Sequence, residues 1–345
     1  MRVLHVVEAV GGGTLSAVLG MVDATPGLEH HLVVWPRREH VAADMEPAAF
    51  SGVHVLPSGL PRAVHALRTT VAARRPDVVH AHSSYAGMLV RSAGLDTRIA
   101  YSPHCFGFER QDLSATGRAG VRRIERALVR RTDVLVACSP HEARLAEELG
   151  HQHVVLVPNR ALRPPAATAR PGHPLRAVAV GRIGAQKDWR FLLAVKASHE
   201  RRHDVPVTWQ WLGNGDAEGR SALRAAGVEV SGWLPRPQVL EQLATAQAYV
   251  HTAAWEAAPV SILEAAAVGL PMLVRSIPTL ASLAVPGLGA TPADLADGLA
   301  ALQDPLRWAA ARAASQQFSA AHTAADQRVA LEAAYDRSPA GLIRS

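Results

Sequence analysis

Short apolar runs alternate with helix-type segments along most of this chain of 345 residues. The first run, Val3–Val7, is followed by three glycines, Gly11–Gly13, and then by apolar residues at helical spacing. Further runs with the length and composition of buried strands lie at 32–35, 53–56, 78–81, 98–101, 134–137 and 154–157. Strands that alternate with helices form a parallel sheet covered by helices on both faces. The sequence therefore predicts an α/β fold.

A Pro- and Ala-rich stretch at 161–174 has little apolar periodicity and predicts a linker between two domains. Strand-type runs resume at 175 and recur at 207–211, 228–231, 248–251 and 272–274. Each half of the chain is long enough to bury its own core. We therefore expect an N-terminal domain at 1–160 and a C-terminal domain at 175–345.

Composition and charge narrow the classes of function. No run of 18 or more apolar residues occurs and the chain starts directly in a strand, so we expect no membrane span, no signal peptide and a cytoplasmic protein. The two cysteines, Cys105 and Cys138, indicate free thiols and argue against a zinc site. The net charge of +6 comes mainly from arginines in both halves, so we expect no nucleic-acid partner.

Two carboxylates, Glu256 and Glu264, accompany one predicted helix. Pro259 suits a first helical turn, where a missing N–H costs nothing, and the Gly-Leu-Pro sequence from Gly269 ends the helix. The helix should therefore cover roughly 260–268. Glu264 then lies on its second turn, and Glu256 lies before it.

This segment follows the strand at 248–251, at the edge of a parallel sheet where ligands bind. At the helix N-terminus, the N–H groups of Val260 and Ser261 can bind an anion. One carboxylate can then face a sugar and the other a ribose. A solvated or helix-capping role is the alternative for either glutamate alone, but their joint position favours a ligand site.

Arg182 and Lys187 flank a short loop between a strand that ends in Gly181 and a helix that starts at Asp188. Two cations then converge on one helix N-terminus. Such a pair can stabilise an anionic group of a ligand. The alternative is a pair of ordinary surface cations, and the strand-loop-helix context favours the functional interpretation.

Polar residues also end two strands of the N-terminal half. His80 and His82 come at the end of one strand, and His104 follows the next strand in a loop with an aromatic residue. A neutral or cationic imidazole can hydrogen-bond a hydroxyl of a ligand and stabilise developing charge. Hydrogen bonding at a strand end is the alternative for each histidine. We take His82 as a candidate ligand-binding residue.

The motifs of the C-terminal half resemble those of retaining glycosyltransferases of family GT4, which have the GT-B fold. Glu256 and Glu264, with seven residues between them, resemble the E-x7-E signature of this family. Ala257 stands where its members usually have glycine. The segment from Arg182 to Lys187 resembles the G-R-x4-K segment, which neutralises the donor diphosphate.

The N-terminal half carries the same resemblance. The segment Tyr101–Gly107 is similar to the T-x-H-G segment of the family, whose histidine reaches the donor sugar. Cys105 replaces the glycine that often follows this histidine. By this resemblance His104 is the histidine that acts in catalysis.

The resemblance implies an architecture as well as a set of site residues. It implies two facing Rossmann-like domains with parallel sheets and an interdomain cleft, and a last helix that packs back on the first domain. The acceptor would bind the N-terminal domain and the nucleotide-sugar the C-terminal domain. Catalytic roles fall to His104, Glu256, Arg182 and Lys187. The substrate-binding candidates are Gly12, Gly13, His82, Gly213, Gly232, Trp233, Val260, Ser261 and Glu264.

An arginine face is the last feature of note. Arg118, Arg122, Arg126 and Arg130 lie at intervals of four residues, opposite an apolar face, in a segment of helical pattern. A basic helix of this kind can lie on an anionic membrane surface. The alternative is a solvated arginine face in which Glu125 is interleaved.

Taken together, these features predict a retaining, metal-independent glycosyltransferase with no cofactor and a UDP- or GDP-linked sugar as donor. The acceptor we expect is a lipid-linked glycan in surface polysaccharide biosynthesis, used at the inner face of the plasma membrane. Two alternatives stay open: transfer to a soluble small molecule, and a sugar-phosphate synthase or epimerase of the same fold.

Overall fold

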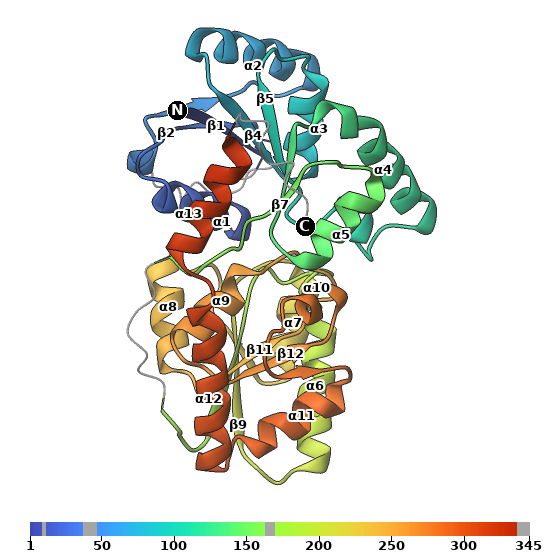
Figure 1. Cartoon of the computed structure of the whole chain (residues 1–345). Coiled ribbons are helices and arrows are strands. Elements are labelled where there is room, and N and C mark those ends of the chain that lie inside the picture. Colours follow the sequence, from blue (N-terminus) through green and yellow to red (C-terminus); the bar gives the residue numbers. More distant parts are fainter. Residues whose placement is uncertain (9–11, 37–46, 163–169, 337–345) are drawn as a thin grey trace. The chain divides into compact units, whose positions relative to one another are not determined.

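The computed structural model describes residues 1–8, 12–36, 47–162 and 170–336. The chain divides into an N-terminal unit, Met1–Asn159 with Thr323–Ser345, and a C-terminal unit, Arg160–His322 (Figure 1). The stretch that we expected to be a linker, 161–174, falls at the start of the C-terminal unit, and its residues 163–169 lie outside the described part of the chain. In the described residues, no helix is both long enough and apolar enough to cross a membrane.

The N-terminal unit is built on a seven-stranded sheet with the order β3-β2-β1-β4-β5-β6-β7, and all of its neighbours pair in parallel. The strands are β1 (Arg2–Val7), β2 (Glu29–Val34), β3 (Gly52–Val55), β4 (Val78–His82), β5 (Arg98–Ser102), β6 (Val134–Ala137) and β7 (Val154–Leu156). The α-helices are α1 (Gly12–Ala24), α2 (Leu60–Arg74), α3 (Ser84–Ser92), α4 (Ala115–Leu128), α5 (Pro140–Leu149) and α13 (Ala324–Tyr335). The described residues also form the short 3-10 helices η2 (Pro47–Ala49), η3 (Gly107–Glu109) and η4 (Val129–Arg131).

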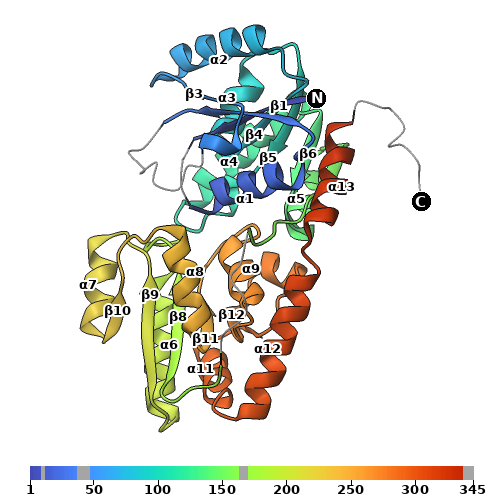
Figure 2. The ribbon, with the colours of Figure 1, turned by 90° about the vertical axis from the view of Figure 1, so that its left-hand side faces the viewer.

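Helices cover both faces of this sheet. Side chains of α2, α3 and α5 pack in one core cluster, and those of α1 and α13 pack in another. The last helix, α13, therefore belongs to the N-terminal unit and lies beside α1 (Figure 2). Because both faces are covered, the strands read as nearly continuous apolar runs. Histidines interrupt several of these runs, and among them His5, His80 and His82 are fully buried.

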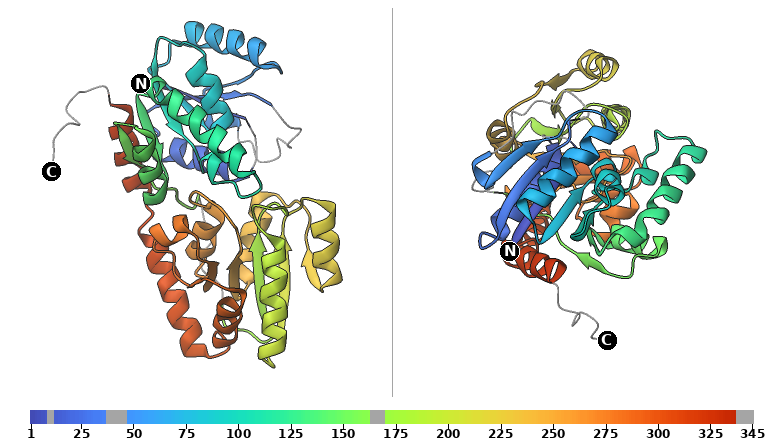
Figure 3. Two further views of the ribbon diagram at one scale, coloured as in Figure 1. Left: turned by 90° about the vertical axis from the view of Figure 1, so that its right-hand side faces the viewer. Right: turned by 90° about the horizontal axis from the view of Figure 1, so that it is seen from above.

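The C-terminal unit is built on a six-stranded sheet with the order β10-β9-β8-β11-β12-β13, and it too is parallel throughout. The strands are β8 (Leu175–Val180), β9 (Val207–Leu212), β10 (Val228–Val230), β11 (Ala248–His251), β12 (Met272–Arg275) and β13 (Leu288–Gly289). The helices are α6 (Trp189–Arg202), α7 (Ala217–Ala225), α8 (Arg236–Thr245), α9 (Val260–Ala267), α10 (Pro278–Ser282), α11 (Pro292–Ala301) and α12 (Pro305–Ala320) (Figure 3). The predicted α/β fold with two parallel sheets is confirmed.

The strand order reverses once in each sheet, between β1 and β4 in the N-terminal unit and between β8 and β11 in the C-terminal unit. Open parallel sheets bind ligands outside the carboxyl ends of the strands at such a point. His82 is the last residue of β4, and Gly12 follows β1. Lys187 and Glu256 lie in the loops that follow β8 and β11. Within each unit the topology therefore collects the predicted residues at the edge suited to binding.

One alternative for helix α4 was a solvated arginine face in which Glu125 is interleaved, and the structure differs from it at Glu125. Glu125 is buried, and its carboxylate accepts hydrogen bonds from Nη2 of Arg91 at 2.8 Å and from the hydroxyl of Tyr101 at 3.0 Å. Ile124, which helical spacing places opposite the arginine face, is half exposed. The side of α4 that faces the unit is thus anchored by a buried ion pair between α3 and α4, which sequence periodicity does not reveal.

Candidate active site

Lys187 and Glu256, two of the predicted site residues, form an ion pair in the C-terminal unit. Nζ of Lys187 lies 2.5 Å from Oε1 of Glu256, and both side chains are largely buried. The two residues are 69 positions apart in the sequence, and the loops after β8 and β11 bring them together where the strand order reverses. A largely buried charge is stable only while its partner is present. The pair is therefore one electrostatic unit.

The backbone beneath this ion pair is also held. The hydroxyl of Thr252 donates a hydrogen bond of 2.5 Å to the carbonyl of Lys187, and that of Thr279 donates one of 2.8 Å to the carbonyl of Glu256. Both threonines are buried. Because the carbonyls on both sides are fixed, the two charges are preorganised rather than carried by loose loops.

His251, at the end of β11, is a site residue that the sequence analysis did not select. Its Nε2 lies 3.9 Å from Oε1 of Glu256, and its Nδ1 lies 3.0 Å from the hydroxyl of Tyr249. Burial, reinforced by the positive charge of Lys187, holds the pKa of His251 well below its usual range. The imidazole is therefore neutral behind the carboxylate. Its position as a polar residue at a strand end, the signal used for His80 and His82, would have identified it.

Glu264 is buried on α9 and forms an ion pair with Arg236, the first residue of α8. Burial raises the pKa of Glu264, and the charge of Arg236 opposes that rise. Arg236 was not among the predicted site residues, because nothing in the sequence relates α8 to α9. The arginine orients the carboxylate that was predicted to bind a ribose.

Helix α9 runs from Val260 to Ala267, one residue shorter than expected, with Pro259 as its N-cap. Within the described residues, no side chain caps this N-terminus. The hydroxyl of Ser261 accepts a hydrogen bond of 2.9 Å from Tyr249. The first N–H groups of α9, including those of Val260 and Ser261, are therefore the donors that this end of the helix can present to an anion.

Arg182 lies beside Trp233, with its guanidinium carbon 6.0 Å from the centre of the indole ring. The Trp233 side chain is 58% exposed. The two residues follow different strands, β8 and β10, so both loops contribute to one surface. An arginine and an exposed indole ring together suit a flat aromatic group such as a nucleobase.

Gly213 and Gly232 pair in an isolated antiparallel bridge beside this surface. A Cβ atom at Gly213 would lie 2.1 Å from the carbonyl oxygen of Gly181, whereas one at Gly232 would meet nothing within 4 Å. Gly213 has a φ of 146° and Gly232 a φ of 77°. The glycine at 213 is thus required by the close packing of two loops, which local sequence does not reveal.

His104 follows β5 and has a left-handed backbone, with φ of 49°, as does Cys105, with φ of 80°. Left-handed conformations cost non-glycine residues roughly 1–2 kcal/mol each. Cys105 thus has the left-handed conformation that glycine, the residue expected here from the resemblance, adopts without strain. Glu142, a buried residue that the sequence analysis did not select, accepts hydrogen bonds from the N–H groups of Cys105, at 2.8 Å, and Cys138, at 2.9 Å.

The His104 side chain is partly buried, and burial lowers its pKa to about 4. The imidazole is therefore neutral at neutral pH. His82 is fully buried, and its Nδ1 lies 3.0 Å from Nε2 of His104. The structure thus places His82 behind His104, where it supports that residue and offers no surface to an acceptor. Gly12 and Gly13 are exposed at the start of α1, and a Cβ atom at either would meet nothing within 4 Å.

The arginine face of α4 is partly engaged within the N-terminal unit. Arg122 forms an ion pair with Glu148 at 2.9 Å, and Arg126 donates to the carbonyl of Glu148 at 3.4 Å. Arg118 donates to the carbonyl of Leu113 at 2.8 Å. Arg126 and Arg130 are exposed. A membrane contact through all four arginines would therefore compete with these internal contacts.

Comparison with known proteins identifies the family. Residues 12–160 match the family described as Glycosyl transferase 4-like domain, and residues 174–310 match the family described as Glycosyl transferases group 1. The chain is a glycosyltransferase of the GT4 type. A Klebsiella pneumoniae protein described as an uncharacterized 41.2 kDa protein in the cps region is 21% identical to this glycosyltransferase over 308 residues, which is 84% of each chain.

Solved structures confirm the GT-B fold of the glycosyltransferase. The apo form of the lipopolysaccharide outer core galactosyltransferase WaaB aligns over 96% of this chain and 99% of its own, with a TM-score of 0.66 and 18% identity. The Anabaena protein HepE, in complex with UDP and glucose, aligns over 96% of this chain and 99% of its own, with a TM-score of 0.76 and 15% identity.

Proposed function

We propose that this glycosyltransferase moves a sugar from a nucleotide-sugar to an acceptor with retention at the anomeric carbon and without a bound metal. The observation that carries the proposal is the buried pair of Lys187 and Glu256 where the strand order of the C-terminal sheet reverses. The α9 N-terminus, whose N–H groups suit an anion, follows Glu256 in the same segment. A cation and backbone donors at one edge suit a leaving diphosphate.

Each site residue has a role in this proposal. Lys187 and Arg182 stabilise the negative charge that develops on the leaving diphosphate, and the N–H groups at the start of α9 add to them. Glu264, held by Arg236, binds the ribose hydroxyls. Glu256 acts in the chemical step beside the transferred sugar, and the neutral imidazole of His104 hydrogen-bonds a hydroxyl of that sugar.

We infer that the donor is a UDP- or GDP-sugar. Trp233 with Arg182 offers a surface on which a base can stack. The UDP in the similar HepE structure makes UDP the first nucleotide to test. The nucleoside diphosphate enters as part of the donor and is released after transfer, so we propose no separate cofactor.

We infer that the acceptor is a lipid-linked glycan of a surface polysaccharide, used at the inner face of the plasma membrane. The relative from a cps region supports this pathway, and the exposed Arg126 and Arg130 supply charge for an anionic surface at about 1 kcal/mol per well-placed arginine. The internal contacts of Arg118 and Arg122 favour the alternative, a soluble small-molecule acceptor.

A panel of UDP-, GDP- and ADP-sugars tests the donor first. Binding stabilises a fold according to affinity, so we expect the melting temperature to rise with UDP- or GDP-sugars and to stay unchanged with ADP-sugars. The stabilising donor is then offered with a lipid-linked sugar in anionic vesicles and with the same sugar in free form. Transfer to the vesicle-bound sugar alone supports the proposed acceptor. Equal transfer to the free sugar contradicts it, and turnover of the donor without any acceptor would indicate an epimerase.

A further inference from the structure

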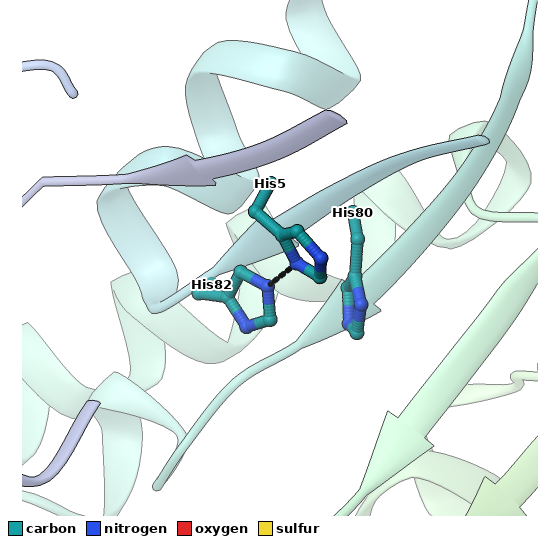
Figure 4. A group of neighbouring side chains, drawn as sticks. All are labelled: His5, His80 and His82. Carbon is teal, nitrogen blue, oxygen red and sulfur yellow. Dashed lines mark hydrogen bonds between the residues drawn. The ribbon is translucent and has the colours of Figure 1, made fainter. Parts of the chain in front are cut away.

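Four imidazoles in the N-terminal unit form a continuous chain of hydrogen bonds that starts at His104. Nε2 of His104 lies 3.0 Å from Nδ1 of His82. Nε2 of His82 lies 3.0 Å from Nδ1 of His5 (Figure 4). Nε2 of His5 lies 3.0 Å from Nδ1 of His30. His82 and His5 thus each use Nε2 toward the next ring and Nδ1 toward the previous one. We call this set the histidine chain.

The far end of the histidine chain has a defined direction. Nε2 of His30 lies 3.1 Å from the carbonyl oxygen of Thr25, which can only accept a hydrogen bond. The hydroxyl of Thr25 lies 3.1 Å from the same nitrogen and donates its own hydrogen to the carbonyl of Met21 at 2.7 Å. Nε2 of His30 must therefore carry a hydrogen.

Burial keeps the histidine chain neutral. It holds the pKa values of His5 and His82 well below the usual range, and like charges on neighbouring histidines would lower them further. Burial also lowers the pKa of His30, and it lowers that of His104 to about 4. A neutral imidazole has one N–H donor and one acceptor nitrogen. The donor–acceptor direction that Thr25 fixes at His30 therefore determines the direction of every hydrogen bond in the histidine chain.

We propose that His82, His5 and His30 are positioning residues that fix His104 as its Nε2–H tautomer. His30 accepts at Nδ1 from His5, His5 accepts at Nδ1 from His82, and His82 accepts at Nδ1 from His104. Nδ1 of His104 is then an acceptor and can receive a hydrogen bond from a hydroxyl. That the hydroxyl belongs to the transferred sugar rests on the proposed function, whereas the tautomer does not.

His80 is the natural control, because it lies against the histidine chain without belonging to it. Its ring centre is 4.0 Å from that of His82 and 5.7 Å from that of His5. Its Nδ1 lies 2.7 Å from the hydroxyl of Tyr335, and its Nε2 lies 2.9 Å from the hydroxyl of Ser102. It is as deeply buried as His5 and equal to it in size.

The same residues raise the question of a metal site. One ring nitrogen from each of His5, His80 and His82 can be chosen so that the three lie within 4.8 Å of one another (Figure 4). However, all six ring nitrogens of these histidines have hydrogen-bond partners. A bound ion would have to replace some of those bonds, so the geometry favours the hydrogen-bonded arrangement.

Nuclear magnetic resonance of the full chain labelled with ¹⁵N-histidine tests the proposal, because long-range correlations show which ring nitrogen carries hydrogen. The His104 signals are assigned by their loss in His104→Gln. We expect wild-type His104 to carry hydrogen on Nε2 and not on Nδ1. Hydrogen on Nδ1 overturns the proposal, and this readout needs no substrate.

Two matched variants extend the test. His5→Phe interrupts the histidine chain, so the Nδ1–H tautomer of His104 should gain population, whereas His80→Phe should leave the tautomer unchanged. Equal effects of the two variants contradict the proposal. If His5→Phe does not fold, His30→Leu interrupts the same chain three rings away from His104.

Activity provides a separate readout. With the donor found by the nucleotide panel, His5→Phe should lower kcat about 2- to 10-fold, with little change in donor KM. This factor corresponds to the free energy of one hydrogen bond. If His104 is the Nε2–H tautomer but the protein turns over no nucleotide-sugar, the role of the histidine chain is supported and the proposed function is rejected. If the protein turns over a nucleotide-sugar but His104 is the Nδ1–H tautomer, the proposed function is supported and the role of the histidine chain is rejected.

Discussion

Replacement of Lys187 or Arg182 by alanine is expected to lower kcat about 100-fold or more, because each side chain supplies a preorganised charge to the leaving diphosphate. Lys187 is held by Glu256, and its backbone carbonyl is held by Thr252. Steady-state turnover of the donor found by the nucleotide panel measures the effect. Lys196→Ala is the matched control, because Lys196 is the other lysine of the chain and pairs with Glu200 on α6.

The ion pair with Glu256 requires a second control for Lys187→Ala. Removal of the lysine leaves a largely buried carboxylate without its partner, which can destabilise the unit by itself. The double variant Lys187→Ala with Glu256→Gln removes that unpaired charge. If Lys187 acts on the diphosphate, the double variant stays at least as slow as Lys187→Ala. Recovery of kcat in the double variant, or near-normal kcat in both single variants, would contradict the assignment.

Glu125→Ala is expected to lower the free energy of unfolding of the N-terminal unit by about 3–5 kcal/mol. The carboxylate pairs with Arg91, which is 34 residues away and 1% exposed, and it accepts the hydrogen bond of the Tyr101 hydroxyl. Its removal leaves a buried guanidinium without a counter-charge. Urea unfolding of the full chain measures the change.

The neighbouring pair of Arg122 and Glu148 supplies the comparison. Its side chains are 39% and 58% exposed, so Glu148→Ala should change the free energy of unfolding by less than about 1 kcal/mol. Glu125→Gln keeps an acceptor for Tyr101, so its loss of unfolding free energy should lie between those of Glu125→Ala and Glu148→Ala. A loss below about 1 kcal/mol in Glu125→Ala would show that the buried pair does not anchor α4.

The fold was predictable because its signal is local. Each buried strand is a short apolar run, and each turn carries glycine, proline or a polar residue, so the alternation in the sequence predicts both sheets. The same reasoning located α9 to within one residue from Pro259 and Gly269. It also placed Lys187 and Glu256 after strands of one sheet, since carboxyl ends of parallel strands share an edge.

The partners of the site residues were not predictable, because they depend on packing between distant segments. Arg236 reaches Glu264 only because α8 and α9 pack together. The histidine chain joins four elements of the N-terminal unit, with His5 77 residues from His82. His82 was therefore predicted to face a ligand, although its ring lies between two other imidazoles. A strand-end histidine has the same local sequence signal in either situation.

The division of roles between Glu264 and Glu256 tests the central claim, that a nucleotide-sugar binds at this edge of the C-terminal sheet. Calorimetric titration of Glu264→Gln and Glu256→Gln with the nucleoside diphosphate of the active donor is the most direct measurement. Loss of a charged acceptor costs about 1.5–3 kcal/mol, so Glu264→Gln should bind the diphosphate about 10- to 150-fold more weakly. Glu256→Gln should bind it nearly as wild type does, while its kcat falls. Equal weakening in both variants, or the reverse pattern, would contradict the account.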